Sequence, residues 1–325
     1  MASCLLSLLM DLPRRALVVL VAGLVAGLAL CTPAAAADRS ALLPPSMPLT
    51  VRVPVQDTAI RGNHPYFIDL LQAALERGGQ SPAIVSAVPL IGSQERLLRY
   101  LEAGEHIDVY WVGTAPDRER RLAPVRVPLT GGLLGIRLPV ILPQRQEEFA
   151  RIRSVEDLRQ YTACQGDQWP DSDILEANGL PVLRINQFHV MYEMLRAGRC
   201  DYFPRSVIEV YAEVAAQPQK SFMIDETLVL AYRYPLYFFT SRDNIALNRR
   251  LEAGLTAMAH DGSLMALIET HPTTSPAFPL HRFQGARILT LTNPLLPQET
   301  PLADRSLWVP FPGVSAPIDS GQKTN

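Results

Sequence analysis

The sequence predicts an α/β fold with two lobes, each lobe a mostly parallel sheet flanked by helices. The first observation is that strand-like and helix-like segments alternate in the order strand, helix, strand, helix, strand, and that this order occurs twice. The second is a repeated phrase. Residues 101–110 and 195–202 both contain Leu, Ala-Gly, Asp and Tyr in that order, where a helix should end and a strand begin. Two units of similar plan are therefore expected to face one another.

The first 37 residues are expected to be a cleaved signal peptide. Residues 14–15 are both arginine, residues 16–30 are apolar but short for a membrane span, and Ala35–Ala37 offers a small-residue cleavage site. The pair Leu30–Cys31 resembles a lipoprotein signal only faintly, because a small residue normally precedes that cysteine. Soluble export to the periplasm is therefore favoured over a lipid anchor.

Length and charge narrow the class of protein. The chain has 325 residues, enough for two lobes after removal of a signal peptide, and its formal net charge is −2. This balance gives no reason to expect nucleic acid or an anionic membrane surface as a partner. A monomer is expected.

Residues 38–140 are expected to form the first part of the first lobe, because they show the β-α-β-α-β pattern clearly. Its strands and helices are predicted at 49–55, 65–77, 83–88, 93–103 and 107–112.

The second lobe is expected at residues 141–228. Ser154 and Asp157 have the spacing of a helix capping box. Its strands and helices are predicted at 161–165, 172–177, 182–185, 187–197 and 200–203.

Residues 229–310 are expected to return to the first lobe. A β-prone stretch at 228–240 precedes one or two helices within 244–270, and a proline-rich tail then wraps the surface. Residues 311–325 are expected to be disordered.

Two cysteines remain after the signal peptide, Cys164 and Cys200. In an oxidising compartment they can form a disulfide, and adjacent strands would bring them close enough. Two buried thiols are the alternative, and the sequence does not decide between them.

Four segments together resemble a known family. Leu101–Asp108 resembles a helix end and strand of the form L-x-x-G-x-x-D, and Thr114–Arg118 resembles a T-x-x-x-R turn. Ser154–Leu158 resembles the entry to a second lobe, and Leu251–Ile268 resembles a closing helix pair. In this order they resemble the extracellular family 3 solute-binding proteins of polar amino-acid ABC transporters. The resemblance covers about residues 48–272.

Three further segments resemble a subgroup of that family without an assigned ligand. They are Trp169–Asp171, Asp201–Arg205 and Asn293–Pro297. The resemblance implies a type II periplasmic binding protein clamshell that captures a small polar or anionic solute and delivers it to an inner-membrane ABC permease. Sensing through a membrane receptor and catalysis on the same fold are the alternative functions.

The candidate ligand residues begin at the end of the third strand. Arg118 matches the family arginine that grips the ligand carboxylate, and a guanidinium fork suits a carboxylate. A solvated surface charge is the alternative, since two arginines follow closely. Tyr110 and Trp111, then Gly113 and Thr114, lie where ligands bind in open α/β sheets. Core packing is the alternative for either aromatic ring.

In the second lobe, Gly166 opens a loop before a short helix, whose free N–H groups attract anions, and Trp169 belongs to that loop. Trp169 alternatively packs at the hinge face. Arg205 stands where family members that bind α-amino acids have an acidic residue. A cation there would attract a second anionic group, unless Arg205 pairs internally with an acid such as Glu209 or Asp201.

Two more cations follow the Arg118 turn. Arg126 is a further candidate ligand residue, and Arg137 lies in an apolar run, where it needs an acidic partner from the protein or the ligand.

The sequence contains no Gly-x-Ser-x-Gly elbow, phosphate loop or dinucleotide fingerprint, and its histidines lack metal-ligand spacing. We therefore expect no enzyme activity, cofactor or metal.

Overall fold

The computed structural model describes residues 48–54, 64–90, 92–218 and 221–315. The expected signal peptide lies outside these residues, as does the predicted disordered end from residue 316 onward. None of the described helices combines the length and the apolar character needed to cross a membrane.

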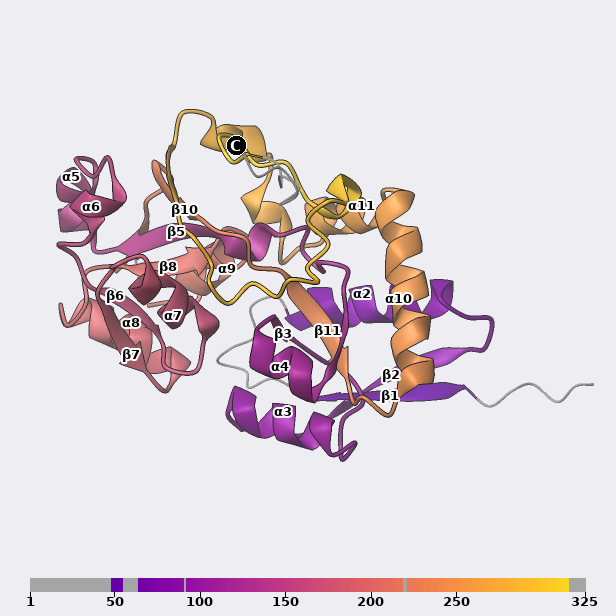
Figure 1. Ribbon diagram of the computed structural model, residues 1–325. Coiled ribbons are helices and arrows are strands. Elements are labelled where there is room, and N and C mark those ends of the chain that lie inside the picture. Colours follow the sequence, from indigo (N-terminus) through magenta and orange to yellow (C-terminus); the bar gives the residue numbers. More distant parts are fainter. Residues whose placement is uncertain (1–47, 55–63, 91, 219–220, 316–325) are drawn as a thin grey trace, which may run out of the picture. The chain divides into compact units, whose positions relative to one another are not determined.

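The first lobe follows the predicted order of elements (Figure 1). Its elements are β1 (Leu49–Pro54), α2 (His64–Arg77), β2 (Ala83–Val88), α3 (Gln94–Glu102), β3 (Tyr110–Gly113), α4 (Pro116–Arg121) and β4 (Ala123–Val125). Strands β1 and β2 pair in parallel, with Val51 opposite Val85. Helix α3 begins at the side chain of Ser93, which accepts a hydrogen bond from the backbone N–H of Arg96.

The third strand of this lobe begins later than predicted, at Tyr110 instead of Ile107. The backbone N–H of Asp108 donates to the carbonyl of Arg52 at 2.8 Å, and the carboxylate of Asp108 accepts from the backbone N–H of Arg52 at 2.8 Å. A side chain thus replaces part of the regular ladder between this segment and β1. From Tyr110 the chain pairs instead with β11 (Leu236–Thr240), in antiparallel register.

The second lobe also keeps its predicted plan. Its elements are α5 (Gln146–Phe149), α6 (Val155–Leu158), β6 (Ala163–Gly166), α7 (Pro170–Ala177), β7 (Val182–Ile185), α8 (Phe188–Arg196), β8 (Phe203–Ser206), α9 (Val210–Ala215) and β9 (Met223–Ile224). Strands β6 and β7 are parallel. Helix α6 has the full capping box, because Ser154 accepts from the N–H of Asp157 and Asp157 accepts from the N–H of Ser154.

Strand β8 lies further along the chain than predicted. Residues 200–202 make only a single parallel bridge, between Ala163 and Tyr202, and the regular strand starts at Phe203. This shift places Arg205 inside the strand instead of beyond its end. Cys164 and Cys200 flank the bridge, are joined by a disulfide, and have Cα atoms 5.5 Å apart.

The β-prone segment 228–240 forms two strands. Strand β10 (Leu228–Ala231) pairs antiparallel with β5 (Ile136–Ile141), whereas β11 pairs with β3 and β4. The break falls before Pro235, which has no N–H for a ladder. The carbonyl of Pro235 still accepts from Thr114, at 3.0 Å. The chain thereby passes from the sheet that contains β10, β5 and β8 to the sheet that contains β3, β11 and β4 (Figure 1).

Two helices close the first lobe, α10 (Ile245–His260) and α11 (Ser263–Thr270). Helix α10 lies beside α2 (Figure 1). Gly254 makes this approach possible, because a Cβ atom there would overlap the backbone of Ala74.

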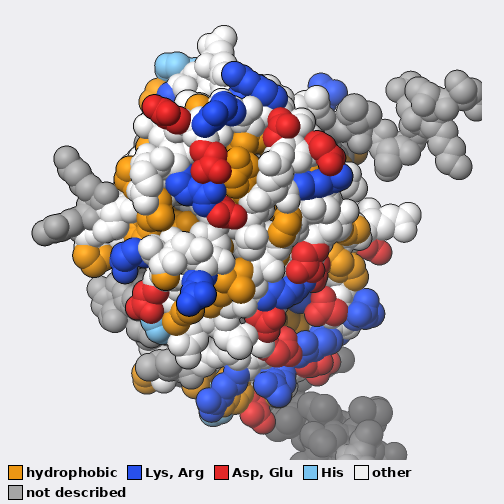
Figure 2. All heavy atoms as spheres, turned by 90° about the vertical axis from the view of Figure 1, so that its left-hand side faces the viewer, with side chains coloured by type: hydrophobic (Ala, Val, Ile, Leu, Met, Phe, Trp, Pro, Cys, Tyr) orange, Lys and Arg blue, Asp and Glu red, His pale blue; other side chains and the backbone are white. Residues whose placement is uncertain are grey.

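The tail contains a strand that the sequence did not predict. Strand β12 (Arg287–Thr290) pairs in parallel with β10. Further on, Trp308 and Phe311 are buried, and the ring of Phe311 stacks on Phe283 with centroids 5.2 Å apart. The packed chain thus continues past residue 310. On the face shown in Figure 2, acidic and basic side chains are interspersed, as expected for a net charge near zero.

Candidate functional site

A cavity of about 140 Å³ lies between residues of both lobes. The first lobe contributes side chains from α2, α3, β3 and α4, and the second contributes side chains from α7, α8, β8 and the start of α9. The crossing segments supply Leu134, Arg137, Tyr234 and Leu236. Strands β3 and β8, which both contribute to the lining, pair antiparallel with β11 and β5, so the cavity is not at the edge of a purely parallel sheet.

Most of the predicted ligand residues line this cavity, and some do not. Those that line it are Tyr110, Trp111, Gly113, Arg118, Trp169 and Arg205. Thr114, Gly166 and Arg126 are outside the lining. Thr114 donates to Glu119 at 2.6 Å, and Arg126 forms an ion pair with the same carboxylate at 2.6 Å. Glu119 therefore accounts for two of the side chains that were candidates for the ligand.

Arg118 faces the cavity as a buried cation held by neutral acceptors. Its guanidinium donates to the carbonyl of Gly113 at 2.7 Å and to Gln94 Oε1 at 2.6 Å. A longer bond, 3.3 Å, reaches the carbonyl of Gln168 in the second lobe. The residue is 6 % exposed, and among the described residues no carboxylate forms an ion pair with it. Sequence reasoning selected this residue, and its surroundings are not those of a solvated surface charge.

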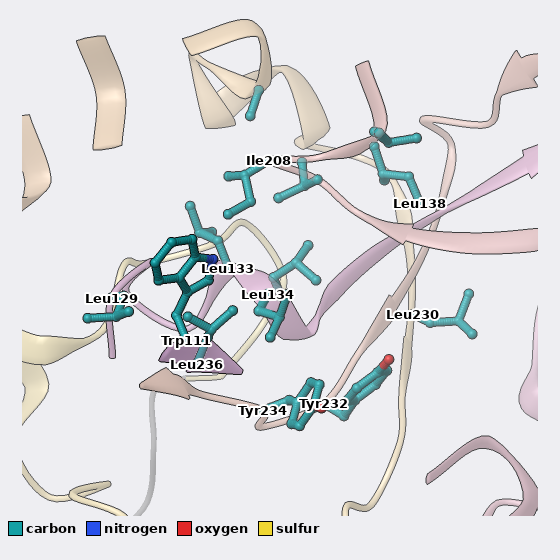
Figure 3. Close-up of a cluster of buried hydrophobic side chains, with 14 of the residues drawn as sticks. Trp111, Leu129, Leu133, Leu134, Leu138, Ile208, Leu230, Tyr232, Tyr234 and Leu236 are labelled. Atoms are coloured by element: carbon teal, nitrogen blue, oxygen red, sulfur yellow. The ribbon is translucent and has the colours of Figure 1, made fainter. Parts of the chain in front are cut away.

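Gly113, the last residue of β3, lies directly against the side chain of Tyr234. A Cβ atom at this position would overlap the ring of Tyr234, so glycine allows the strand and the ring to touch. Trp111, Leu236 and Tyr234 belong to one buried cluster (Figure 3). Tyr110 packs on the other side of the strand, in a second cluster. Burial raises the pKa of Tyr110 to about 12, and the charge of Arg118 opposes that shift.

Arg205 has partners within the protein. Its guanidinium makes two parallel hydrogen bonds to Glu213, at 2.7 and 2.6 Å, and lies 3.0 Å from Glu209 Oε2. The internal pairing foreseen as the alternative is therefore present, with Glu209 and Glu213 and not with Asp201. Asp201 pairs with Arg145 instead. Two carboxylates thus balance the charge of Arg205 within the protein, which favours the internal-pairing alternative over a second anionic ligand group at this residue.

Arg137 also has its acidic partner inside the protein. Its guanidinium contacts the carboxylate of Asp171 and donates to the hydroxyl of Tyr232 at 3.0 Å, and it lies 3.6 Å from Glu209. Both Arg137 and Asp171 are almost fully buried. Asp171 thus holds strand β5 to helix α7.

Glu209 lines the cavity, and one of its carboxylate oxygens is buried without a hydrogen bond from any described residue. It lies between Arg137 and Arg205, yet no described donor makes a hydrogen bond to its Oε2 atom. Burial raises the pKa of Glu209, and the positive charge of Arg205 opposes this shift. Sequence reasoning missed Glu213 altogether. The spacing of Arg205, Glu209 and Glu213 at intervals of four residues was the available signal.

Gly166 serves the cavity indirectly. A Cβ atom there would overlap the indole of Trp169, so the glycine lets this ring lie flat on strand β6. The loop also stabilises the start of α7, because the carbonyl of Gly166 accepts a hydrogen bond from the hydroxyl of Ser172 at 2.7 Å. The described residues contain no group of three His, Cys, Asp or Glu side chains that could hold a metal ion.

Comparisons with known proteins bear on the fold. No family model and no curated protein matches the sequence. Among solved structures, the binding component of an ABC transporter from Wolinella succinogenes, complexed with lysine, aligns with a TM-score of 0.52 at 17% identity over 68% of this chain and 94% of its own. The fold is that of the two-lobed periplasmic binding proteins.

Two further structures of this kind align similarly. An ancestral arginine-binding protein bound to glutamine has a TM-score of 0.50 at 18% identity, over 70% of this chain and 99% of its own. A Salmonella typhimurium periplasmic binding protein with high arginine specificity has a TM-score of 0.50 at 15% identity, over 68% of this chain and 98% of its own. At such identities the likeness concerns the fold, and it confirms the two-lobe clamshell that the sequence predicted.

Proposed function

We propose that this protein is an exported solute-binding protein. A small solute with a carboxylate or similar anionic group binds between the lobes, and the closed form delivers it to an ABC-type permease of the inner membrane. The predicted signal peptide supports a periplasmic location of the mature chain, where such proteins meet their solutes. No catalytic step is part of this proposal.

The single observation that carries the proposal is the state of Arg118. A buried guanidinium without a counter-charge is costly, because neutral carbonyls replace only part of its hydration. A bound carboxylate would supply the missing charge through two parallel hydrogen bonds. The other two cations of the cavity, Arg137 and Arg205, already have carboxylate partners. Arg118 is therefore the group to which an anionic ligand is most strongly drawn.

The position of Arg118 also suits closure of the lobes. Its bond to the carbonyl of Gln168 spans from the first lobe to the second. A ligand carboxylate on the same guanidinium would stabilise the arrangement in which both lobes contact it. Closure needs such differential affinity, because a ligand that binds open and closed forms equally shifts nothing.

The solved structures of the same fold support this class of ligand. Two of them contain lysine or glutamine, and both of these amino acids carry a carboxylate. The cavity here is smaller than the range of about 300–1,000 Å³ typical of ligand pockets. We therefore favour a solute of about the size of a small amino acid or organic acid.

Binding is tested with Arg118→Gln. A panel of small carboxylates is screened on the mature protein by thermal unfolding, and hits are measured by calorimetry. We expect the variant to weaken binding by roughly 30-fold or more, equivalent to about 2 kcal/mol or more. Arg120→Gln is the matched control, because Arg120 lies on the same helix but is exposed. Equal binding by wild type and Arg118→Gln would refute the proposal.

Delivery is tested separately from binding. Cells that lack this protein should take up the bound solute more slowly, and the solute should be recovered unchanged after incubation with purified protein. Normal uptake together with a changed transcriptional response would point to sensing, and chemical conversion of the solute would point to catalysis.

A further inference from the structure

Arg205 sits in surroundings that have the chemistry of a guanidinium-binding site. Its side chain is 7 % exposed, and both nitrogens of one edge bind Glu213 in parallel. The central carbon lies 5.0 Å from the ring centre of Trp169 and 5.4 Å from that of Phe188. Aromatic faces and a bidentate carboxylate are the two features that recognise this planar cation.

These surroundings are part of the cavity wall. Trp169, Phe188, Glu209 and Glu213 line the cavity together with Arg205 itself. The protein's own side chain, attached to strand β8, therefore occupies the place that a cationic group of a ligand would take. Phe203 lies beneath it, 5.2 Å from the guanidinium carbon, and belongs to the same strand.

We propose that Arg205 is a specificity-determining residue, a tethered occupant that excludes ligands with a second, cationic group. Removing its side chain opens a subsite for a free guanidinium or ammonium ion between Trp169, Phe188 and Glu213. This inference deepens the proposed function, on which its statement about ligand class rests, but the subsite itself is independent of Arg118.

The balance of charge explains the exclusion. An incoming cation would have to displace Arg205 from Glu213 and leave its buried guanidinium with Glu209 as its remaining carboxylate, so the two parallel hydrogen bonds to Glu213 would be lost at a cost. The tethered side chain also has a high effective concentration, since its strand holds it next to its carboxylate. A ligand without a cationic group meets neither penalty, because the two carboxylates of the subsite are already paired.

The test uses Arg205→Ala and methylguanidinium chloride, a cation that has no carboxylate. We expect the variant to be less stable than the wild type and its melting temperature to rise in a saturable way with methylguanidinium, by several degrees at concentrations well above the dissociation constant. Sodium chloride at equal ionic strength should not reproduce this rise. Wild type should show no saturable rise.

Arg184→Ala is the matched control. Arg184 also binds two carboxylates, Asp173 and Glu176, but it is 30 % exposed and lies outside the cavity. Its variant should not be rescued by methylguanidinium, since an exposed site gains little from a paired cation. Should Arg205→Ala fail to fold, Arg205→Met keeps an apolar stem over Phe203 and serves the same measurement. No saturable effect in either variant, or an equal effect in wild type, would overturn the inference.

A second arm compares L-arginine with L-citrulline, its neutral isostere. Arg205→Ala should favour L-arginine over L-citrulline by about tenfold or more, whereas wild type should not. The two proposals fail in different ways. Rescue by methylguanidinium without carboxylate binding in wild type contradicts the proposed function only. Carboxylate binding through Arg118 without rescue contradicts the role of Arg205 only.

Discussion

The carboxylate of Asp171 binds both the guanidinium of Arg137 and the hydroxyl of Tyr232, and so holds helix α7 against the β5–β10 strand pair. The side chains of Arg137 and Asp171 are 2 % and 5 % exposed. An ion pair this deeply buried offers little net gain over apolar packing, but the loss of one partner leaves a charge without compensation.

The first prediction concerns this pair. Asp171→Ala should lower the free energy of unfolding by about 3–5 kcal/mol, because Arg137 is left buried with only its 3.6 Å contact to Glu209. Asp173→Ala, on the same helix, is the control. Its carboxylate is 53 % exposed, and its pair with Arg184 should contribute less than about 1 kcal/mol. Urea denaturation measures both values, and equal losses would show that burial is not the cause.

The disulfide gives a second prediction. Cys164 and Cys200 are separated by 36 positions in sequence, and the bond restricts a loop of this length in the unfolded chain. Replacing both cysteines by serine should lower the free energy of unfolding by about 3–4 kcal/mol. Alkylation of the denatured, unreduced protein should find no free thiol at these positions. Two alkylated cysteines would instead support the buried-thiol alternative.

A third prediction isolates a steric contact in the tail. Gly132 and Gly262 share the same backbone geometry, φ 80° and ψ −2°. A Cβ atom at Gly132 would come within 2.5 Å of the ring of Trp308, whereas a Cβ atom at Gly262 would meet nothing within 4 Å. Alanine at either site costs about 1 kcal/mol in backbone strain. Gly132→Ala should lower the free energy of unfolding by about 1–3 kcal/mol more than Gly262→Ala does, because it also displaces Trp308. Chemical denaturation of both variants measures this difference.

Trp308 itself allows a check of that explanation. Its indole N–H donates to the carbonyl of Pro301 at 2.9 Å, and Arg233 lies 5.7 Å from the ring centre. When Trp308 is replaced by alanine, Gly132→Ala and Gly262→Ala should lower the free energy of unfolding by equal amounts. A difference that persists would place the cost in the backbone alone.

The fourth prediction concerns pH. Hydrogen bonds from Ser263 lower the pKa of Asp261 from its ordinary value of 3.8 to about 2. A carboxyl whose pKa is lower in the folded state stabilises the fold above its ordinary pKa, and this contribution disappears as the pH falls. Its effect should therefore be complete above pH 3.8 and be lost between pH 3.8 and about 2.

Asp261→Asn separates this effect from other acids. The difference in unfolding free energy between wild type and variant should be constant above pH 3.8 and shrink toward pH 2. NMR titration of the Asp261 carboxyl checks the pKa directly. A midpoint near 3.8 would contradict the prediction.

Local features of the site were predictable where they depend on residues close in sequence. The Thr114–Arg118 turn pointed correctly to a cavity residue, and the spacing of Ser154 and Asp157 gave the capping box. The roles of Arg126 and Arg205 were not predictable in this way. Their carboxylate partners depend on how strand and helix are placed, because a short interval in the sequence, as between Arg205 and Glu209, brings two side chains together only where the fold allows it.

The sequence by itself determined the two-lobe α/β plan, because the periodicity of strands and helices and the helix-ending glycines are local properties of about ten residues. Only the tertiary structure decided which charges remain free in the cavity. Asp171 meets Arg137 and Glu213 meets Arg205 across separate elements, and these contacts leave Arg118 as the cavity-lining cation without a carboxylate partner among the described residues. Charge compensation acts over a few ångströms in space, so it follows the fold and not the order of residues.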